Sequence, residues 1–168
     1  VLERTQDEIR FVDAEPFVEQ DVFASIDPET GRPTYDLSRK PETGRMAEFC
    51  PSMWGGKDWP PAAFNPDTRL LYIPANENTC GAGEGEEEPE YQPGRPFIGA
   101  TTDFSLREGT QHIGELQAWD LDRGEKVWTQ EFEAANWVPV LTTAGGLVFM
   151  GGTDDRYFRA FDARTGEI

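Results

Sequence analysis

Short apolar runs alternate with turn-forming residues along most of the chain. The runs are rich in aromatic and β-branched side chains, and glycine, aspartate or proline separates each run from the next. Runs of this kind predict short β-strands. The predicted strands lie at residues 70–73, 116–121, 126–132, 138–142, 147–150 and 157–161. No segment keeps a helical spacing of apolar residues over several turns, so the predicted fold class is all-β.

Four turn sequences share one chemistry. Each opens with an aspartate or asparagine, whose side chain can accept hydrogen bonds from the backbone amides just ahead. The opening residues are Asp27, Asn65, Asp120 and Asp162. Four positions later a glycine, which tolerates a positive φ, closes three of these turns, and Arg69 closes the other. The openings are 38, 55 and 42 residues apart, and the long middle interval contains an insertion.

The last two turns lie inside a repeated motif with the pattern A-x-D-x-x-x-G-x-x-x-W. Its residues are Ala118, Asp120, Gly124 and Trp128 in the first copy, and Ala160, Asp162 and Gly166 in the second. A period near forty residues, built of strands and turns, is typical of a β-propeller blade. We predict about three to four blades, with Trp128 wedged between neighbouring blades and Ala118 kept small to receive a ring. The second copy ends before its tryptophan position, as expected for part of a larger propeller.

The chain is strongly acidic, with 15 Lys and Arg residues against 32 Asp and Glu residues and a net charge of -17. This balance argues against a nucleic-acid partner, because phosphate binding needs clustered Lys and Arg side chains. No apolar run approaches the roughly 20 residues that a membrane-spanning helix needs. We therefore expect a protein that is membrane-free or peripheral.

An insertion of residues 81–114 separates the second and third turns. Its centre, residues 83–90, is an acidic low-complexity run. We interpret the insertion as a solvated, mobile loop. The alternative is a metal-binding or partner-binding surface, but contiguous glutamates without ordered spacing are poor evidence for a calcium site.

Few side chains suggest a metal site. The two cysteines, Cys50 and Cys80, could pair or stay reduced, and neither belongs to a CxxC motif. With His112 as the one histidine, zinc and iron–sulfur sites are not expected. We interpret His112 as a solvated surface group. Turn chemistry or packing at the core or rim accounts for the other candidates, which are Asn136, Trp137, Asp154 and Asp155.

The repeated motif resembles the tryptophan-docking motif of quinoprotein alcohol dehydrogenases, which use pyrroloquinoline quinone (PQQ). Three further stretches are similar to that family, at residues 54–66, 71–80 and 141–149. The resemblance covers nearly the whole chain, so residues 1–168 are interpreted as a partial PQQ-dehydrogenase propeller domain. The segment Gly-Gly-Lys-Asp-Trp-Pro at residues 55–60 is its most specific part.

The resemblance implies an eight-bladed propeller that binds one PQQ near its axis and oxidises a primary alcohol to an aldehyde by hydride transfer to the quinone. The metal of this family, calcium or a lanthanide, has its ligands upstream of this segment, as does the catalytic base. We therefore expect no catalytic residue and no metal ligand in this chain. The family also implies a periplasmic location, a small alcohol substrate, a cytochrome c electron acceptor and a possible homodimer. Relatives pair cysteines at similar spacing, which implies a disulfide between Cys50 and Cys80.

By position in the resembling segment, Lys57, Asp58 and Trp59 would form one wall of the PQQ pocket. PQQ carries three carboxylates and two quinone oxygens, so it favours donors and a flat apolar contact. Lys57 offers a cationic donor, and Trp59 offers an indole N–H with an aromatic face. Asp58 suits an anionic ligand less well, and many relatives have asparagine there, so it could instead bind Lys57 or backbone amides. The alternative is that Lys57 and Asp58 form a turn and Trp59 belongs to the core.

A rival interpretation is a non-catalytic propeller scaffold that uses the same docking motif to present a binding surface. The Gly-Gly-Lys-Asp-Trp-Pro segment favours the enzyme, because a scaffold has no need of it.

We expect the isolated 168-residue chain to show no dehydrogenase activity with PQQ and calcium. The reason is that the metal ligands and the base are expected elsewhere and that cut blade edges invite aggregation. The measurement is alcohol-dependent dye reduction by the purified chain, and any such reduction would prove this interpretation wrong.

Overall fold

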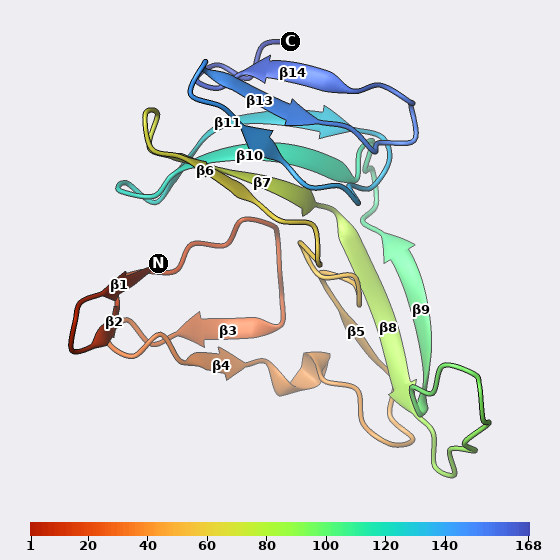
Figure 1. Ribbon diagram of the computed structural model, residues 1–168. Coiled ribbons are helices and arrows are strands. Elements are labelled where there is room, and N and C mark those ends of the chain that lie inside the picture. Colours follow the sequence, from red (N-terminus) through yellow and green to blue (C-terminus); the bar gives the residue numbers. More distant parts are fainter.

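The computed structural model describes residues 1–168 and is built almost entirely of β-strands (Figure 1). The strands are β1 (Leu2–Arg4), β2 (Ile9–Phe11), β3 (Phe23–Ile26), β4 (Pro33–Tyr35), β5 (Ala47–Phe49), β6 (Ala63–Asn65), β7 (Leu70–Asn76), β8 (Thr79–Gly85), β9 (Ala100–Leu106), β10 (Gly114–Asp120), β11 (Glu125–Phe132), β12 (Leu141–Thr142), β13 (Leu147–Met150) and β14 (Arg159–Asp162). One 3₁₀ turn, η1, spans Leu37–Arg39. The all-β prediction is confirmed.

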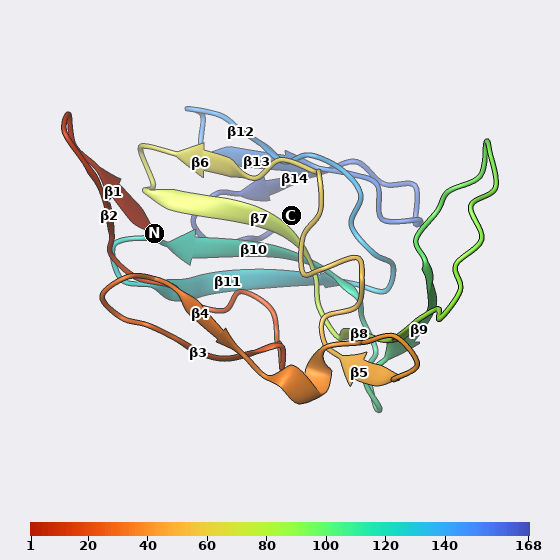
Figure 2. The ribbon, with the colours of Figure 1, turned by 90° about the horizontal axis from the view of Figure 1, so that it is seen from below.

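The centre of the structure is a four-stranded antiparallel sheet with the order β11-β10-β7-β6. Its strands follow one another across the sheet as in a propeller blade, and the hairpin β8–β9 is inserted between the second and third strands. A second sheet, β12-β13-β14, lies beside this blade (Figures 1 and 2). Two neighbouring sheets of this kind are the repeating arrangement of a propeller.

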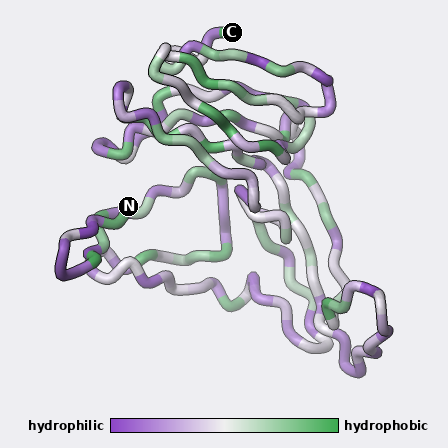
Figure 3. The backbone as a smooth tube through the Cα atoms, in the orientation of Figure 1, coloured by the Kyte–Doolittle hydropathy of each residue, from purple (hydrophilic) through white to green (hydrophobic).

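The hydrophobic core fills the space between these two sheets. Its ten buried residues are Leu70, Tyr72, Leu116, Ala118, Phe132, Val140, Val148, Met150, Phe161 and Ala163. They come from alternate positions of the facing strands, because successive side chains of a strand point to opposite faces. Figure 3 shows hydrophobic residues gathered on these two sheets, whereas many of the connections are hydrophilic. Adjacent blades therefore hold together through side chains that neither sheet could bury alone.

Trp128 links the two sheets directly. It lies opposite Ala118 in the β10–β11 pairing, and its indole Nε1 donates a hydrogen bond of 3.2 Å to the carbonyl oxygen of Ala163. A Cβ atom at Gly166 would lie 2.7 Å from the Trp128 ring, so a glycine is needed where the ring meets the turn after β14. The Tyr72 hydroxyl donates to the same Ala163 oxygen at 2.9 Å. Trp128 thus sits between Ala118 of its own repeat and Gly166 of the next one.

All four predicted turns form as expected. In each, the side-chain oxygen of the opening residue accepts backbone N–H groups two and three positions ahead. These amide hydrogen bonds are the main reason why the pKa values of Asp27 and Asp162 lie below their usual range. The closing residues have positive φ, including Arg69 at 59°. The Arg69 guanidinium forms a two-point ion pair with Asp122, with both N–O distances at 2.6 Å.

The expected insertion loop at 81–114 contains a β-hairpin as well as connecting segments. Residues of β8 and β9 pair in an antiparallel hairpin from Thr79–Leu106 to Gly85–Ala100, and only residues 86–99 connect the two strands. Strand β5 adds to the other side of β8. Gly81 and Gly83 look like loop residues in the sequence, but they sit where Phe49 and Pro41 approach the strand closely. Glycine at such a position marks a close neighbour rather than a turn.

The four turn signals are distributed over blade sheets and a separate hairpin. One sheet has four strands, and the next has three. The turn that opens at Asp27 closes a separate two-stranded hairpin, β3–β4, and β1–β2 form another pair. The turn chemistry was predicted correctly, but the same turn also serves hairpins outside a blade.

The Gly166→Ala substitution should destabilise the intact protein more than Gly124→Ala does. Both glycines have positive φ, at 75° and 67°, so an added side chain strains both by about 1 kcal/mol or more. At Gly166 the new methyl group would also collide with the Trp128 ring, whereas at Gly124 it would meet only the flexible side chain of Glu15. Overpacking of this kind typically adds about 1–3 kcal/mol.

The measurement is thermal unfolding of both variants and of the unsubstituted protein. Equal decreases in melting temperature would show that Trp128 does not constrain position 166.

Candidate functional site

The long connections gather at one end of the central blade. Gly114, at the start of β10, pairs with both Asn76 at the end of β7 and Phe132 at the end of β11. Connections 77–113 and 133–140 therefore leave from this end, and so does segment 51–62, which enters β6. The short turns at 66–69 and 121–124 lie at the other end (Figure 1). The residues singled out from the sequence near position 58 thus share one end of the blade with every long connection of the sheet.

A disulfide between Cys50 and Cys80 fixes the start of segment 51–62 to β8. The expected cysteine pair is confirmed. Next to it, the backbone N–H of the buried Ser52 donates to the carbonyl oxygen of Thr79 at 3.1 Å. The covalent bond and the hydrogen bond together hold this segment against the base of the inserted hairpin.

Gly56 fixes the middle of the same segment. Its carbonyl oxygen accepts a 2.8 Å hydrogen bond from the backbone N–H of Asn76, at the end of β7. A Cβ atom at this position would overlap the side chain of Val18. The preceding Gly55 has a φ of 66°, in the left-handed region that favours glycine. The two glycines therefore allow the segment to pass closely between Val18 and the blade.

Lys57, Asp58 and Trp59 follow at once; Lys57 is half-buried, whereas Asp58 and Trp59 are exposed. Lys57 borders a cavity of about 660 Å³ that is otherwise lined by Pro51, Gly56 and ten residues between Ala14 and Ile26. Asp58 and Trp59 do not line this cavity. Its Nζ donates to the backbone oxygen of Asp58 at 3.0 Å. The carboxylate of Asp58 makes no ion pair with Lys57, so the expected contact between the two side chains is not formed. Trp59 is 66% exposed and is not part of the core of this chain.

Three aromatic rings connect the segments around this site. Trp54 stacks at a tilt on Phe104 of β9, with ring centroids 4.3 Å apart, and meets Trp137 edge-on at 5.2 Å. Trp137 packs at the rim, as expected. The contribution of Trp54 and Phe104 was missed, because nothing in the sequence brings residues fifty positions apart together.

Asn76 and Asn136 form a buried lock at the same end of the blade. The backbone N–H of Asn136 donates to the Asn76 side-chain oxygen at 2.7 Å, and the Asn76 amide donates back to the Asn136 carbonyl oxygen at 3.3 Å. The Asn136 amide also donates to the carbonyl oxygen of Glu115 at 2.8 Å. These bonds satisfy backbone groups that strand pairing leaves open. They fix connection 133–140 beside segment 51–62.

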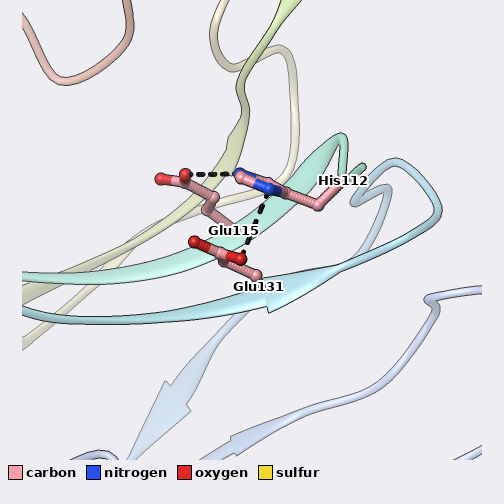
Figure 4. Close-up of side chains that lie close together, drawn as sticks. All are labelled: His112, Glu115 and Glu131. Atoms are coloured by element: carbon pink, nitrogen blue, oxygen red, sulfur yellow. Dashed lines mark hydrogen bonds and ion pairs between the residues drawn. The ribbon is translucent and has the colours of Figure 1, made fainter. Parts of the chain in front are cut away.

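His112 is not the solvated surface group that we expected. Its side chain is only 20% exposed, and its two ring nitrogens face two carboxylates (Figure 4). Nε2 lies 2.9 Å from Oε1 of the buried Glu115, and Nδ1 lies 3.4 Å from Oε2 of Glu131. Glu115 is only three residues ahead in the sequence, but Glu131 lies on β11 and reaches the ring only through the fold.

This cluster of His112, Glu115 and Glu131 does not suit a metal ion, although its ligand atoms lie within 4.8 Å of one another. An ion can bind only one nitrogen of the ring, yet each carboxylate faces a different nitrogen (Figure 4). The second oxygen of Glu115 accepts a 2.6 Å hydrogen bond from Gln117 and lies 3.6 Å from the Lys126 ammonium. Donors and a cation already occupy this carboxylate.

Asp155 shapes the connection between β13 and β14. Its Oδ1 accepts the backbone N–H of Tyr157 at 3.0 Å, as expected for a turn residue. Its carboxylate also pairs with Arg159, at 2.5 Å between Nη2 and Oδ2. The Arg159 hydrogen bonds are the main cause that lowers the pKa of Asp155 to about 2. The neighbouring Asp154 is exposed.

Comparison with known proteins supplies the family. The PQQ family described as "Glucose/ethanol/alcohol dehydrogenase, beta-propeller domain" matches residues 12–168. The chain belongs to this family. The quinoprotein ethanol dehydrogenase of Pseudomonas putida is 38% identical over 99% of the chain. The lanthanide-dependent methanol dehydrogenase of Methylacidiphilum fumariolicum is 36% identical over the whole chain.

Solved structures agree. A europium-containing methanol dehydrogenase superposes on 93% of the chain with a TM-score of 0.82 and 36% identity. The chain covers 27% of that structure and of each of the two relatives above. It therefore spans about a quarter of the length of these quinoprotein dehydrogenases. Among its elements there is no helix with the length and apolar character required to cross a membrane.

Proposed function

We propose that the intact protein is a PQQ-dependent dehydrogenase that oxidises primary alcohols to aldehydes, and that this chain supplies one part of its propeller. The observation that carries the proposal is the family match over residues 12–168. The proteins named as ethanol and methanol dehydrogenases support an alcohol as the substrate. The match to only about a quarter of their length means that the activity belongs to the whole propeller.

The residues at the candidate site suit a planar, anionic cofactor. Lys57 places a cation at the edge of a mainly apolar cavity, and Trp59 offers an exposed aromatic face and an indole N–H. When bound, PQQ would accept a hydride from the alcohol. Lys57 would attract the cofactor carboxylates, and Trp59 would orient the ring system by stacking or hydrogen bonding. The role of Asp58 would be indirect, since its backbone oxygen already holds the Lys57 ammonium.

The remaining parts of the proposal concern groups outside this chain. A calcium or lanthanide ion would be bound by residues elsewhere in the protein, as would the catalytic base. The europium-containing and lanthanide-dependent relatives support such an ion. The Cys50–Cys80 disulfide favours an oxidising compartment, and we propose the periplasm. A cytochrome c would then accept the electrons, and a homodimer is a further expectation.

The rival proposal is a propeller scaffold without catalysis. The rigid support of segment 51–62 favours the enzyme, because a disulfide, a backbone bond to β7 and two glycines hold a segment that carries Lys57 beside a cavity and the exposed Asp58 and Trp59. Active sites are typically placed on loops that a rigid scaffold positions in this way.

The direct test uses the intact protein with PQQ and either calcium or a lanthanide ion. We expect reduction of an artificial dye acceptor that depends on a primary alcohol and on PQQ, with the protein lacking PQQ as the control. Protein that binds PQQ but oxidises no alcohol would contradict the proposed reaction. Protein that binds no PQQ under any of these conditions would favour the scaffold.

Trp59→Ala should weaken PQQ binding more than Trp128→Ala does at equal folded fraction. Trp59 is exposed at the candidate site, and loss of a stacking or hydrogen-bonding partner typically weakens affinity about ten- to a hundredfold. Trp128 packs between two sheets and should act through stability, because Trp→Ala in a core costs about 3–5 kcal/mol.

The two variants therefore serve as controls for each other. PQQ titration and thermal unfolding should be measured on both. Wild-type PQQ affinity in Trp59→Ala, combined with weakened binding in folded Trp128→Ala, would show that the cofactor wall has been assigned to the wrong tryptophan.

A further inference from the structure

The cluster around His112 shares no residue with segment 51–62 and has no role in the proposed reaction. His112 belongs to the connection that returns from β9 to β10, while its two carboxylate neighbours, Glu115 and Glu131, come from β10 and β11. A single ring thus contacts two neighbouring strands of the blade, β10 and β11 (Figure 4). The asymmetry of the two contacts is large, because the Glu115 side chain is 7% exposed and the Glu131 side chain is 64% exposed.

The chemistry of the ring decides how many of these contacts can exist at once. A neutral imidazole has one N–H donor and one acceptor nitrogen, whereas the protonated ring donates from both nitrogens. An ionised carboxylate can only accept. The neutral ring can therefore satisfy one of the two glutamates, and the other would face a lone pair. The observed arrangement is complete only when His112 carries a proton on both nitrogens.

The surrounding charges show which contact would be lost. Two groups lie near Nε2 of His112: the Asn78 amide nitrogen at 3.4 Å and Oε1 of Glu115 at 2.9 Å. The carboxylate is therefore the closer partner. Glu115 is buried and needs its donors, whereas Glu131 can turn into water. Lys126, at 3.6 Å from Glu115, is the other cation of the cluster.

A third carboxylate belongs to the same environment. Burial is the main cause that raises the pKa of Glu77, and the charge of Glu115 raises it further. Glu77 and Glu115 therefore lie near both Lys126 and His112, whereas Glu131 is paired with His112 alone.

We propose that His112 is a proton-dependent clamp at the base of the inserted hairpin β8–β9. With the ring protonated, the clamp ties connection 107–113 to both β10 and β11. On deprotonation the ring keeps Glu115 and releases Glu131. The contact is therefore complete while the ring carries both protons and is lost when the ring gives one of them up.

The clamp acts on the base of the hairpin because both of its arms meet there. The Asn78 side chain, just before β8, donates to the carbonyl oxygen of His112 at 3.3 Å. The backbone N–H of Arg107, just after β9, donates to the Asn78 carbonyl oxygen at 3.0 Å. Loosening of connection 107–113 should therefore affect the ends of both β8 and β9. This inference does not depend on the proposed enzymatic activity.

The experiment is amide hydrogen exchange of the intact protein, followed by mass spectrometry from pH 5 to 8.5 and corrected for the intrinsic pH dependence of exchange. We expect the protection of residues 107–113 to fall about two- to fivefold as the pH rises, the size expected for a partly exposed ion pair. Glu131→Gln should remove this step, because a neutral amide can donate to the neutral ring. His112→Gln should give the low level of protection at every pH.

Glu125→Gln is the matched control, since it makes the same change on an exposed residue of the same strand that has no contact with His112. It should keep the full pH step. The proposal is overturned if the unsubstituted protein shows no step, or if Glu131→Gln keeps it. Should His112→Gln disorder the whole segment, the comparison of Glu131→Gln with Glu125→Gln still decides the question.

Discussion

The packing of Trp128 against the neighbouring sheet is the contact on which the arrangement of this chain depends. The indole ring fills the space between Ala118 of its own sheet and Gly166 of the next, and its N–H satisfies the Ala163 carbonyl together with Tyr72. Neither sheet could bury its inner face alone, so the relative position of the two blades follows from this one fit. A larger residue at either small position would move one sheet away from the other.

Once the two sheets are fixed, the antiparallel order of the blade places its short turns at one end and its long connections at the other. Tight turns with aspartate or asparagine close one end, and they need only local hydrogen bonds. The other end carries the long connections, which have to be held by contacts between distant segments. The disulfide, the Asn76–Asn136 lock and the packing of Trp54 provide these contacts. Segment 51–62 is therefore rigid in its support and open at Lys57 to Trp59.

Local chemistry explains what could be predicted from the sequence. The turn residues and the strands at 70–73 and 147–150 are specified by neighbours in the chain, and all of them form. Strand β12 is shorter than the predicted 138–142, because the Val140 amide bonds to Pro61 outside the sheet. Strand β8 was not predicted, because Gly81 and Gly83 are typical of loops. In the structure these glycines are needed because Phe49 and Pro41 approach the strand closely. The burial of His112 was not predicted either, because Glu131 reaches the ring only through the fold.

The surroundings of the five tryptophans support the assignment of the candidate site. Trp119 and Trp128 each donate their indole N–H to an oxygen within the chain, and Trp54 and Trp137 pack against each other. Trp59 has neither an indole hydrogen bond nor an aromatic partner, and it is the most exposed of the five tryptophans. An exposed indole on a mobile loop would carry little meaning, because scattered surface hydrophobic residues are common. Trp59 instead lies three residues after Gly56, which is anchored to the blade, and nine residues after Cys50, which is anchored to the hairpin. The disulfide and the Gly56 hydrogen bond thus fix a segment whose Trp59 side chain is 66% exposed, which suits the proposed ligand-binding role.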